Sequence, residues 1–441
     1  MTDLNSMSTK ISKRIASAII NSLSAGVVPR IGIDNVAVGR EKEIKSLLQN
    51  LEDVAQKGAA FRFIVGNYGS GKSFMLQLLR NQAMEQGFVV ADADLSAEKR
   101  LAGTNQEGLA TYRELMRNMA IKNRPEGGAL VSILEGWINK IQQEVAKETG
   151  TRPNDDRFDD YVETRIQEVV ASIEGLVHGF DFGNVISAYW RGYRLGNDEK
   201  KSAALRWLRG EFNSKTEAKS ALAEVRVIID DDTWYDYIKL IAKFTADIGY
   251  QGLLVFLDEA VHLYQIANAI AREKNYDKLL AIFNDTMQGR VENLGIFVSG
   301  TPKFLEDPNR GLFKNPAWQR RTKESRFVKQ AGMQDVFSPV IRLTPLNSAE
   351  IYALLQRIAD VHAVNFGYEV KLQKQDFQNF VQAVENRLGA EALLTPGEIV
   401  RDFIGVLNVI HQNPAIAFSQ LIRGADLRLT SNKDDAAEFS L

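Results

Sequence analysis

The sequence predicts an α/β fold with a parallel sheet at its core, interrupted by a long helical segment. Short apolar runs such as FRFIV (61–65) and LGIFVSG (294–300) have the length and composition of strands buried on both faces of a parallel sheet. A glycine-rich loop follows the first run, and a helical pattern starts directly after it. Between about 96 and 245 the pattern is almost wholly helical, so we expect strands on both sides of that segment to form the sheet.

Composition limits the class of protein. The chain has 441 residues, of which 45% are hydrophobic and 25% charged, so it can bury a large core and is long enough for several sub-domains. A net charge of -2 means that any basic surface must be local. The absence of cysteine excludes disulfides, and four scattered histidines disfavour a zinc site. No apolar run is long enough for a membrane span, so we expect a cytoplasmic protein without a membrane partner.

The elements before the helical segment alternate between helix and strand. Apolar residues at helical spacing predict a helix over 9–23, which Gly26 and Pro29 end. A second helix follows the turn VGRE, and the run FRFIV then leads through the glycine loop into a helix that starts at Lys72. The run FVVADADL (88–95) is expected to be the next strand.

Strand patterns return after residue 245, and helical patterns then close the chain. One closing helix carries a full capping-box sequence with proline at the first helical position. In order, we expect strands over 252–259, 294–300 and 340–346, a helix opened by Asn347 with Glu350, a helix over about 374–387, and a helix opened by Thr395-Pro396-Gly397-Glu398.

Residues 66–73 read GNYGSGKS and match the phosphate-binding pattern G-x-x-x-x-G-K-[ST], with a strand before it and a helix after it. Glycines at this spacing let backbone amides turn toward phosphate oxygens, and the helix N-terminus adds its dipole. Lys72 would bridge the β- and γ-phosphates, and Ser73 would ligate Mg²⁺. A glycine-rich turn formed by chance is the disfavoured alternative, because spacing and flanks both match. The expected nucleotide contacts are Gly66, Asn67, Tyr68, Gly69, Ser70, Gly71, Lys72, Ser73 and Phe74.

The pair Asp258-Glu259 ends a predicted strand and supplies the acids that such a site needs. Asp258 would hold Mg²⁺ through water, and Glu259 would polarise the attacking water. The alternative is an acid pair that caps a helix after a buried strand. Ser299 ends the next strand, where it could contact the γ-phosphate or simply belong to a turn.

A basic stretch follows, RGLFKNPAWQRRTKESRFVK (310–329), with Glu324 as its one acid. An arginine in it could reach the γ-phosphate bound by a neighbouring subunit. The stretch could equally contact DNA phosphates or form a solvated basic face. Its cations are Arg310, Lys314, Arg320, Arg321, Lys323, Arg326 and Lys329.

These motifs resemble those of a known family. VGREKEI, GNYGSGKS, FLDE and SGTP, with three closing helices, resemble an AAA+ ATPase near the origin-recognition and Cdc-six-like initiator group. More narrowly, blocks such as GVVPRIGIDNVAVGREKEI, GTPKFLEDPNRGLF and LTPGEIVRDFIGVLN resemble the BrxD-type P-loop family of bacterial BREX phage-defence systems, over about 10 to 412. The resemblance implies an AAA+ fold with ATP and Mg²⁺ as cofactors. It also implies double-stranded DNA, further copies of the chain, and a protein of the same operon, for example a helicase, as partners.

The resemblance also implies roles for further residues. Val38 and Gly39 would lie beside the adenine, and Arg310 or Arg320 would be the arginine finger. Arg401 is the candidate sensor arginine of a helical lid, where Gly397 stands in place of the arginine that the family pattern has after proline.

Spacing predicts the architecture. Lys72 and Asp258 lie 186 positions apart, whereas the intervening core elements alone need roughly 50 to 70 residues. Only 29 residues follow Gln412, too few for a winged-helix domain. We expect an N-terminal helical segment (1–35), an AAA+ αβ core (36–95 and 246–345), a helical insertion (96–245), a helical lid (346–412) and a C-terminal tail (413–441).

DNA would then have to contact the insertion or the basic stretch. Within the insertion, ISAYWRGYRLG (186–196) interleaves aromatic residues with Arg191 and Arg194, as grooves for nucleic acid do. Aromatic residues at helical spacing more often belong to a core.

Two functions compete. The first is an ATP-hydrolysing AAA+ protein that assembles on, or regulates a partner on, double-stranded DNA. The second is an ATP-dependent assembly or signalling switch with slow turnover, in which the insertion docks a protein partner. GTP is disfavoured, because the N-K-x-D match at Asn432–Asp435 falls in the last ten residues instead of after a core strand.

Overall fold

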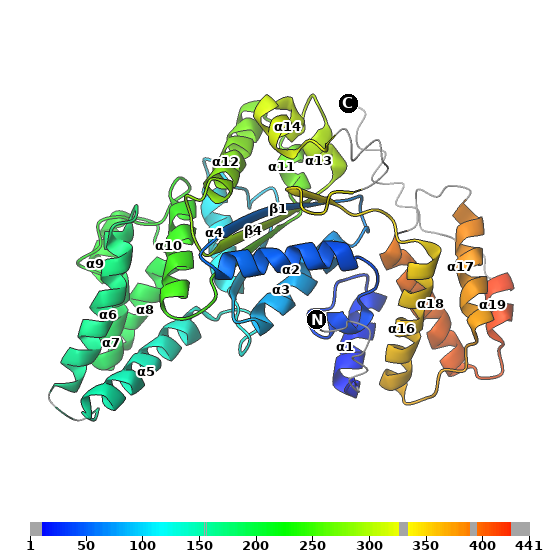
Figure 1. The fold of residues 1–441 in the computed structure, drawn as a ribbon, viewed down its shortest axis with the longest axis horizontal. Helices are drawn as coiled ribbons and strands as arrows, with labels where there is room; N and C mark the ends of the chain where they lie inside the picture. The colour runs from blue at the N-terminus through cyan, green and yellow to red at the C-terminus, as the bar shows by residue number, and fades with distance from the viewer. Residues whose placement is uncertain (1–10, 154, 156, 326–333, 389–394, 425–441) are drawn as a thin grey trace. The chain divides into compact units, whose positions relative to one another are not determined.

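The computed structural model describes residues 11–153, 155, 157–325, 334–388 and 395–424, without the side chains of 384–388. Its described strands form a five-stranded parallel sheet of order β2-β3-β4-β1-β5. In this sheet β4 lies beside β1 (Figure 1). Each strand overlaps the run predicted for it, so the predicted parallel α/β core is confirmed. The strands are β1 (Ala59–Val65), β2 (Val89–Asp94), β3 (Leu253–Asp258), β4 (Leu294–Gly300) and β5 (Val340–Arg342).

Helices cover both faces of the sheet, which explains why its strands are continuous apolar runs. On one face, α2 (Glu41–Ala55) and α3 (Lys72–Glu85) pack against Leu254, Phe256 and other side chains of alternate strand positions. On the other face, the core includes side chains of α4 (Glu107–Asn118), α10 (Trp234–Asp247) and α12 (Ala269–Met287).

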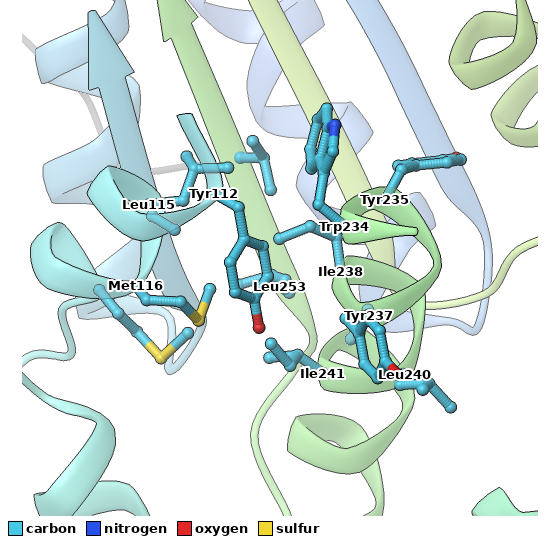
Figure 2. Packing of buried hydrophobic residues seen from close by; sticks show 14 of the residues in the cluster. Tyr112, Leu115, Met116, Trp234, Tyr235, Tyr237, Ile238, Leu240, Ile241 and Leu253 are labelled. Carbon is cyan, nitrogen blue, oxygen red and sulfur yellow. The ribbon is translucent and has the colours of Figure 1, made fainter. Parts of the chain in front are cut away.

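The helical segment between β2 and β3 shares its core with the sheet. Tyr112 of α4 points toward Ile238 and Ile241 of α10, beside Leu253 of β3 (Figure 2). Helix α10 contacts β3 as well as α6, so it links the sheet to the more distant helices (Figure 1). Those helices are α5 (Leu130–Thr149), α6 (Phe158–Glu174), α7 (Gly179–Arg194), α8 (Asp198–Leu208) and α9 (Lys215–Ala221).

Short elements follow the carboxyl ends of β3 and β4. Helix α11 comes directly after the acid pair, and α13 begins with Pro302 after its cap Thr301. These elements are α11 (Val261–Gln265), α13 (Pro302–Glu306), the 3-10 helix η2 (Leu312–Lys314) and α14 (Pro316–Thr322).

The chain divides into two compact units, and the sheet belongs to the one that covers Arg40–Thr344. The other unit joins the chain up to Gly39 with the chain from Pro345 onward. In it, α1 packs against α16 and α18, so the N-terminal helix and the closing helices share one core. Its elements are α1 (Lys13–Ser24), the 3-10 helix η1 (Ile33–Val36), α16 (Ser348–Phe366), α17 (Lys374–Leu388), α18 (Pro396–Gln412) and α19 (Phe418–Gly424).

Local signals located most helix ends of this unit, with one error. Asn347 with Glu350 and Thr395 with Glu398 both form complete capping boxes, as predicted. The assignment of all of 413–441 to a tail was wrong, because α19 occupies part of it and buries Phe418 against α17 and α18. A helix of this length is held by such tertiary contacts and has almost no signal of its own.

Candidate nucleotide-binding site

The glycine loop connects β1 to α3 and turns where glycine is required. Gly69 and Gly71 have φ angles of 71° and 92°, in the left-handed region that other residues rarely adopt. A side chain at Gly66 would collide with the hydroxyl of Ser70. The amide of Gly66 donates to the carbonyl of Gly300 at 3.1 Å, which ties the start of the loop to the end of β4.

The loop has groups that suit a phosphate. The Oγ of Ser70 is buried and has no hydrogen-bond partner in the described part of the chain. The space beside Gly71 is open, and Lys72 Nζ lies under the loop, where it donates to the carbonyl of Asn67 at 3.0 Å. With the N-terminus of the 14-residue helix α3 behind it, this donor set fits phosphate oxygens.

The charged side chain of Lys72 is buried. Its residue is only 6% exposed, and this burial lowers the pKa of the ammonium group, while the nearby carboxylates of Glu259 and Asp258 oppose the shift. The ammonium group of Lys72 is therefore stabilised by the carbonyl of Asn67 and by the carboxylates of Glu259 and Asp258.

The acid pair lies at the carboxyl end of β3, in the same unit as the loop. The hydroxyl of Ser299, which is fully buried, donates to Asp258 Oδ1. The amide of Glu259 donates to the same oxygen at 2.8 Å and lies 3.3 Å from Ser299 Oγ. Ser299 thus orients the carboxylate of Asp258, a role that its place at a strand end did not predict.

Glu259 is held in an unusual conformation and environment. Its φ angle is 57°, which is uncommon for a residue with a side chain. Burial raises the pKa of its carboxyl, and the charge of Asp258 raises it further, against the effect of Lys72 and His262. A carboxyl with a raised pKa beside a phosphate loop is suited to take part in proton transfer.

Asp94 is a further acid at this edge, which the motifs in the sequence did not indicate. The register of β2 and β3 pairs Asp94 with Asp258, and side chains of paired positions in a parallel sheet point to the same face. The side chain of Asp94 is exposed to solvent, but the pKa of its carboxyl is raised. The largest cause is partial desolvation of the carboxyl by neighbouring atoms, and the second is the charge of Asp258. The signal was available, since Asp94 is the last acid of the predicted strand FVVADADL.

The two candidate finger arginines have different surroundings. Arg310 donates from Nε to the carbonyl of Tyr264 at 2.8 Å, and from Nη2 to the carbonyls of Gln265 and Ile266 at 3.2 Å each. It therefore caps the carbonyl end of α11. Arg320 on α14 is exposed and makes no hydrogen bond or ion pair with the residues that the structure describes.

Three other candidates belong to the second unit. The backbone at Gly39 has a φ of 66°, and a side chain there would meet the carboxylate of Glu350. Val38 is half-buried beside it, and Arg401 is exposed on α18. Their assignments to the adenine and to a sensor stay predictions.

The aromatic segment 186–196 belongs to the core. Tyr189 and Trp190 are each only 1% exposed, while Arg191 and Arg194 pair with Glu224 and Glu163. The core interpretation is therefore confirmed, and the alternative of a nucleic-acid stacking surface at this segment is wrong.

Some predicted positions lie outside the described residues, namely Arg326, Lys329 and the match to the guanine signature at Asn432–Asp435. Among the helices that the structure does describe, none has the length and apolarity needed to cross a bilayer.

Comparison with known proteins agrees with the geometry of the loop. The model of a family described as BREX system ATP-binding protein BrxC/D matches residues 11–426. The match includes the glycine loop, the acid pair and the described helices of both units. A comparison with curated proteins gave no match.

Proposed function

Because the chain belongs to the family of BREX system ATP-binding proteins BrxC/D, we propose that it hydrolyses ATP with Mg²⁺ in a bacterial phage-defence system and thereby acts on, or regulates a partner on, double-stranded DNA. Membership itself supports an ATP-binding role in phage defence. The single observation that carries hydrolysis is the pair Asp258-Glu259, with its Ser299 hydrogen bond, at the sheet edge next to the phosphate loop.

The residues divide the chemistry among themselves. Lys72 would exchange the carbonyl of Asn67 for phosphate oxygens, while Ser73 and Asp258 would hold Mg²⁺. When bound, Mg²⁺ neutralises charge on the phosphate oxygens. Glu259 would orient and polarise the attacking water, for which its carboxyl must be ionised. Ser299 would keep the carboxylate of Asp258 in place.

Catalysis by an assembly would need an arginine from a neighbouring copy, and Arg320 is the better candidate. Its side chain is exposed and uncommitted among the described residues, whereas Arg310 is bound to backbone carbonyls of its own chain. In the second unit, Val38 and Gly39 would contact the adenine and Arg401 would act as the lid sensor.

ATP turnover by the purified chain tests this proposal. We expect Glu259→Gln to bind ATP as the wild type does and to lose turnover by roughly 10²- to 10⁴-fold, since it lacks the base. Lys72→Ala should lose ATP binding itself. Turnover is measured with and without long duplex DNA, while light scattering follows assembly size.

Duplex-stimulated turnover, with a large ATP-bound assembly of Glu259→Gln trapped on DNA, is the expected result. Tight ATP binding with negligible turnover that DNA does not change would contradict hydrolysis as the working step. That outcome would favour the ATP-dependent assembly or signalling switch, in which nucleotide occupancy alone changes the assembly and a protein partner is docked.

A further inference from the structure

An open groove of about 940 Å³ is lined by residues of α7, of α9 and of the segment after α9. These residues are distant in sequence from the glycine loop. Four of its lining residues are cations, and Glu224 is the one acid among those described. Glu224 is already neutralised, because Arg191 Nη1 lies 2.8 Å from its Oε1. The remaining cations are Lys215, Lys219 and Arg226, which are exposed and form no ion pair within the described chain.

The surrounding contacts hold these cations at the groove. Lys215 and Lys219 lie one helical turn apart on α9, so their side chains share one face of that helix. The acid between them, Glu217, pairs with Arg206 at 2.6 Å, so it does not neutralise either lysine. The backbone amide of Arg226 donates to the buried carboxylate of Asp181 at 2.7 Å, which anchors the third cation.

One wall of the groove adds an aromatic face. Phe180 is 47% exposed, and the guanidinium of Arg226 lies 5.3 Å from the centre of its ring. An exposed ring beside unpaired cations is the combination that contacts both the backbone and the bases or sugars of nucleic acid. An enclosed pocket for a small anion would instead bury its charged groups, which this groove does not.

We propose that this groove binds the phosphate backbone of DNA through Lys215, Lys219 and Arg226, with Phe180 as a contact for a sugar or base. The inference rests on the DNA part of the proposed function and assigns it to helices remote in sequence from both the nucleotide loop and the basic stretch 310–329. It replaces the stacking surface considered at 186–196, where Tyr189 and Trp190 are buried and Tyr193 is partly buried against the core.

Binding of labelled DNA to the full chain by fluorescence anisotropy tests the groove. The variant Lys215→Gln/Lys219→Gln/Arg226→Gln is compared with Lys45→Gln/Arg117→Gln/Lys147→Gln, which removes the same three charges from exposed positions on α2, α4 and α5. Duplex and single-stranded forms of about 30 nucleotides are both titrated between about 50 and 200 mM salt. Thermal unfolding and ATP turnover without DNA check that each variant is folded.

The groove variant should bind duplex DNA roughly tenfold or more weakly at low salt, and its salt slope should fall by about 2 to 3. The control variant should bind as the wild type does. Phe180→Ala should weaken binding by roughly fivefold or more and leave the salt slope unchanged, since it removes no charge. If the wild type binds single-stranded DNA more tightly than duplex DNA, and the groove variant loses this preference, the ligand of the groove is single-stranded DNA.

Unchanged DNA binding by the groove variant would overturn the inference and leave the proposed function intact. Absence of DNA binding by the wild type would instead remove the DNA part of the proposed function together with the groove, while ATP hydrolysis would still stand on its own measurement.

Discussion

At the scale of single residues, the site is organised by hydrogen bonds among Asp258, Glu259 and Ser299. Asp258 Oδ1 accepts from both Ser299 and the amide of Glu259, so two protein donors fix the orientation of the carboxylate. Hydrogen bonds to an ionised group contribute about 1.5 to 3 kcal/mol each. The buried hydroxyl of Ser299 is therefore a positioning group for Asp258, whose charge contributes to the raised pKa values of Glu259 and Asp94.

The neighbourhood of Glu259 leads to a prediction about pH. In the proposed mechanism Glu259 must be ionised to polarise water, so turnover should fall as pH drops through its pKa, which burial and then Asp258 raise. Asp94 also raises this pKa, so Asp94→Asn should lower it and move the acid limb of the rate profile to lower pH. The measurement is kcat against pH.

Asp277→Asn serves as the control, because Asp277 is exposed on α12 and does not contribute to the pKa of Glu259. An acid limb that stays in place in Asp94→Asn, or that moves equally in Asp277→Asn, would show that Asp94 is not coupled to Glu259.

At the scale of elements, the two candidate finger arginines differ because they contact different short helices. Arg310 binds the carbonyl end of α11, and Arg320 is exposed on α14. Helix α11 ends in carbonyls that Arg310 caps, while α14 starts at Pro316 after its cap Asn315 and leaves Arg320 exposed. Sequence position alone made these two arginines equivalent. Their elements make one a structural group and the other a side chain available to a neighbouring copy.

Replacement of the two arginines by alanine should therefore have different effects, one on stability and the other on turnover. Arg310→Ala should lower the free energy of unfolding by roughly 1 to 3 kcal/mol, because it removes hydrogen bonds to backbone carbonyls. Arg320→Ala should keep the wild-type melting temperature and lose turnover by roughly three orders of magnitude. Thermal unfolding and assembled-state kcat measure the two effects.

Mixing variants tests whether Arg320 acts between copies. Subunits with Arg320→Ala retain Glu259, and subunits with Glu259→Gln retain Arg320, so a mixed assembly should regain part of the activity that each lacks alone. Co-assembly without any recovery would contradict a role for Arg320 across the interface.

At the scale of the whole molecule, the helical segment and the sheet share one hydrophobic core within the unit Arg40–Thr344, so we expect them to unfold together. Trp234 of α10 is 2% exposed and donates from Nε1 to the carbonyl of Leu101 at 3.0 Å. Its helix contacts both β3 and α6, so the same core continues from the sheet into the helices that line the basic groove. A shared core also gives a physical route by which the two regions can influence each other.

Replacement of Trp234 tests this unity. We expect Trp234→Ala to cost about 3 to 5 kcal/mol, as for other large buried aromatic residues, and to destabilise sheet and helices together. Urea unfolding is followed by far-UV circular dichroism and by binding of a fluorescent ATP analogue. Leu195→Ala, at a site that is 68% exposed, should change little. A variant that loses helical signal at low urea but keeps nucleotide binding would show two independent units.

Sequence patterns alone predicted the strands, the glycine loop between a strand and a helix, the acid pair at a strand end and the capped helices. These features depend on near neighbours, such as an unbroken apolar run, glycines at set spacing, or a cap three residues before its partner. The elements predicted there agree with the structure, because a strand and a helix flank the glycine loop, Asp258 ends β3, and Thr395 caps α18. Helix α19 had no such signal and was missed.

Which side chains lie next to one another depends on the packing of segments far apart in the sequence. The tertiary structure buried Tyr189 and Trp190, placed Asp94 beside Asp258, bound Arg310 to α11 and assembled a basic groove from α7, α9 and Arg226. Each of these results depends on the register of strands or the packing of helices far apart in sequence. Residue type and local spacing carry no information about such pairs, because burial and charge compensation are set by whatever the fold brings alongside.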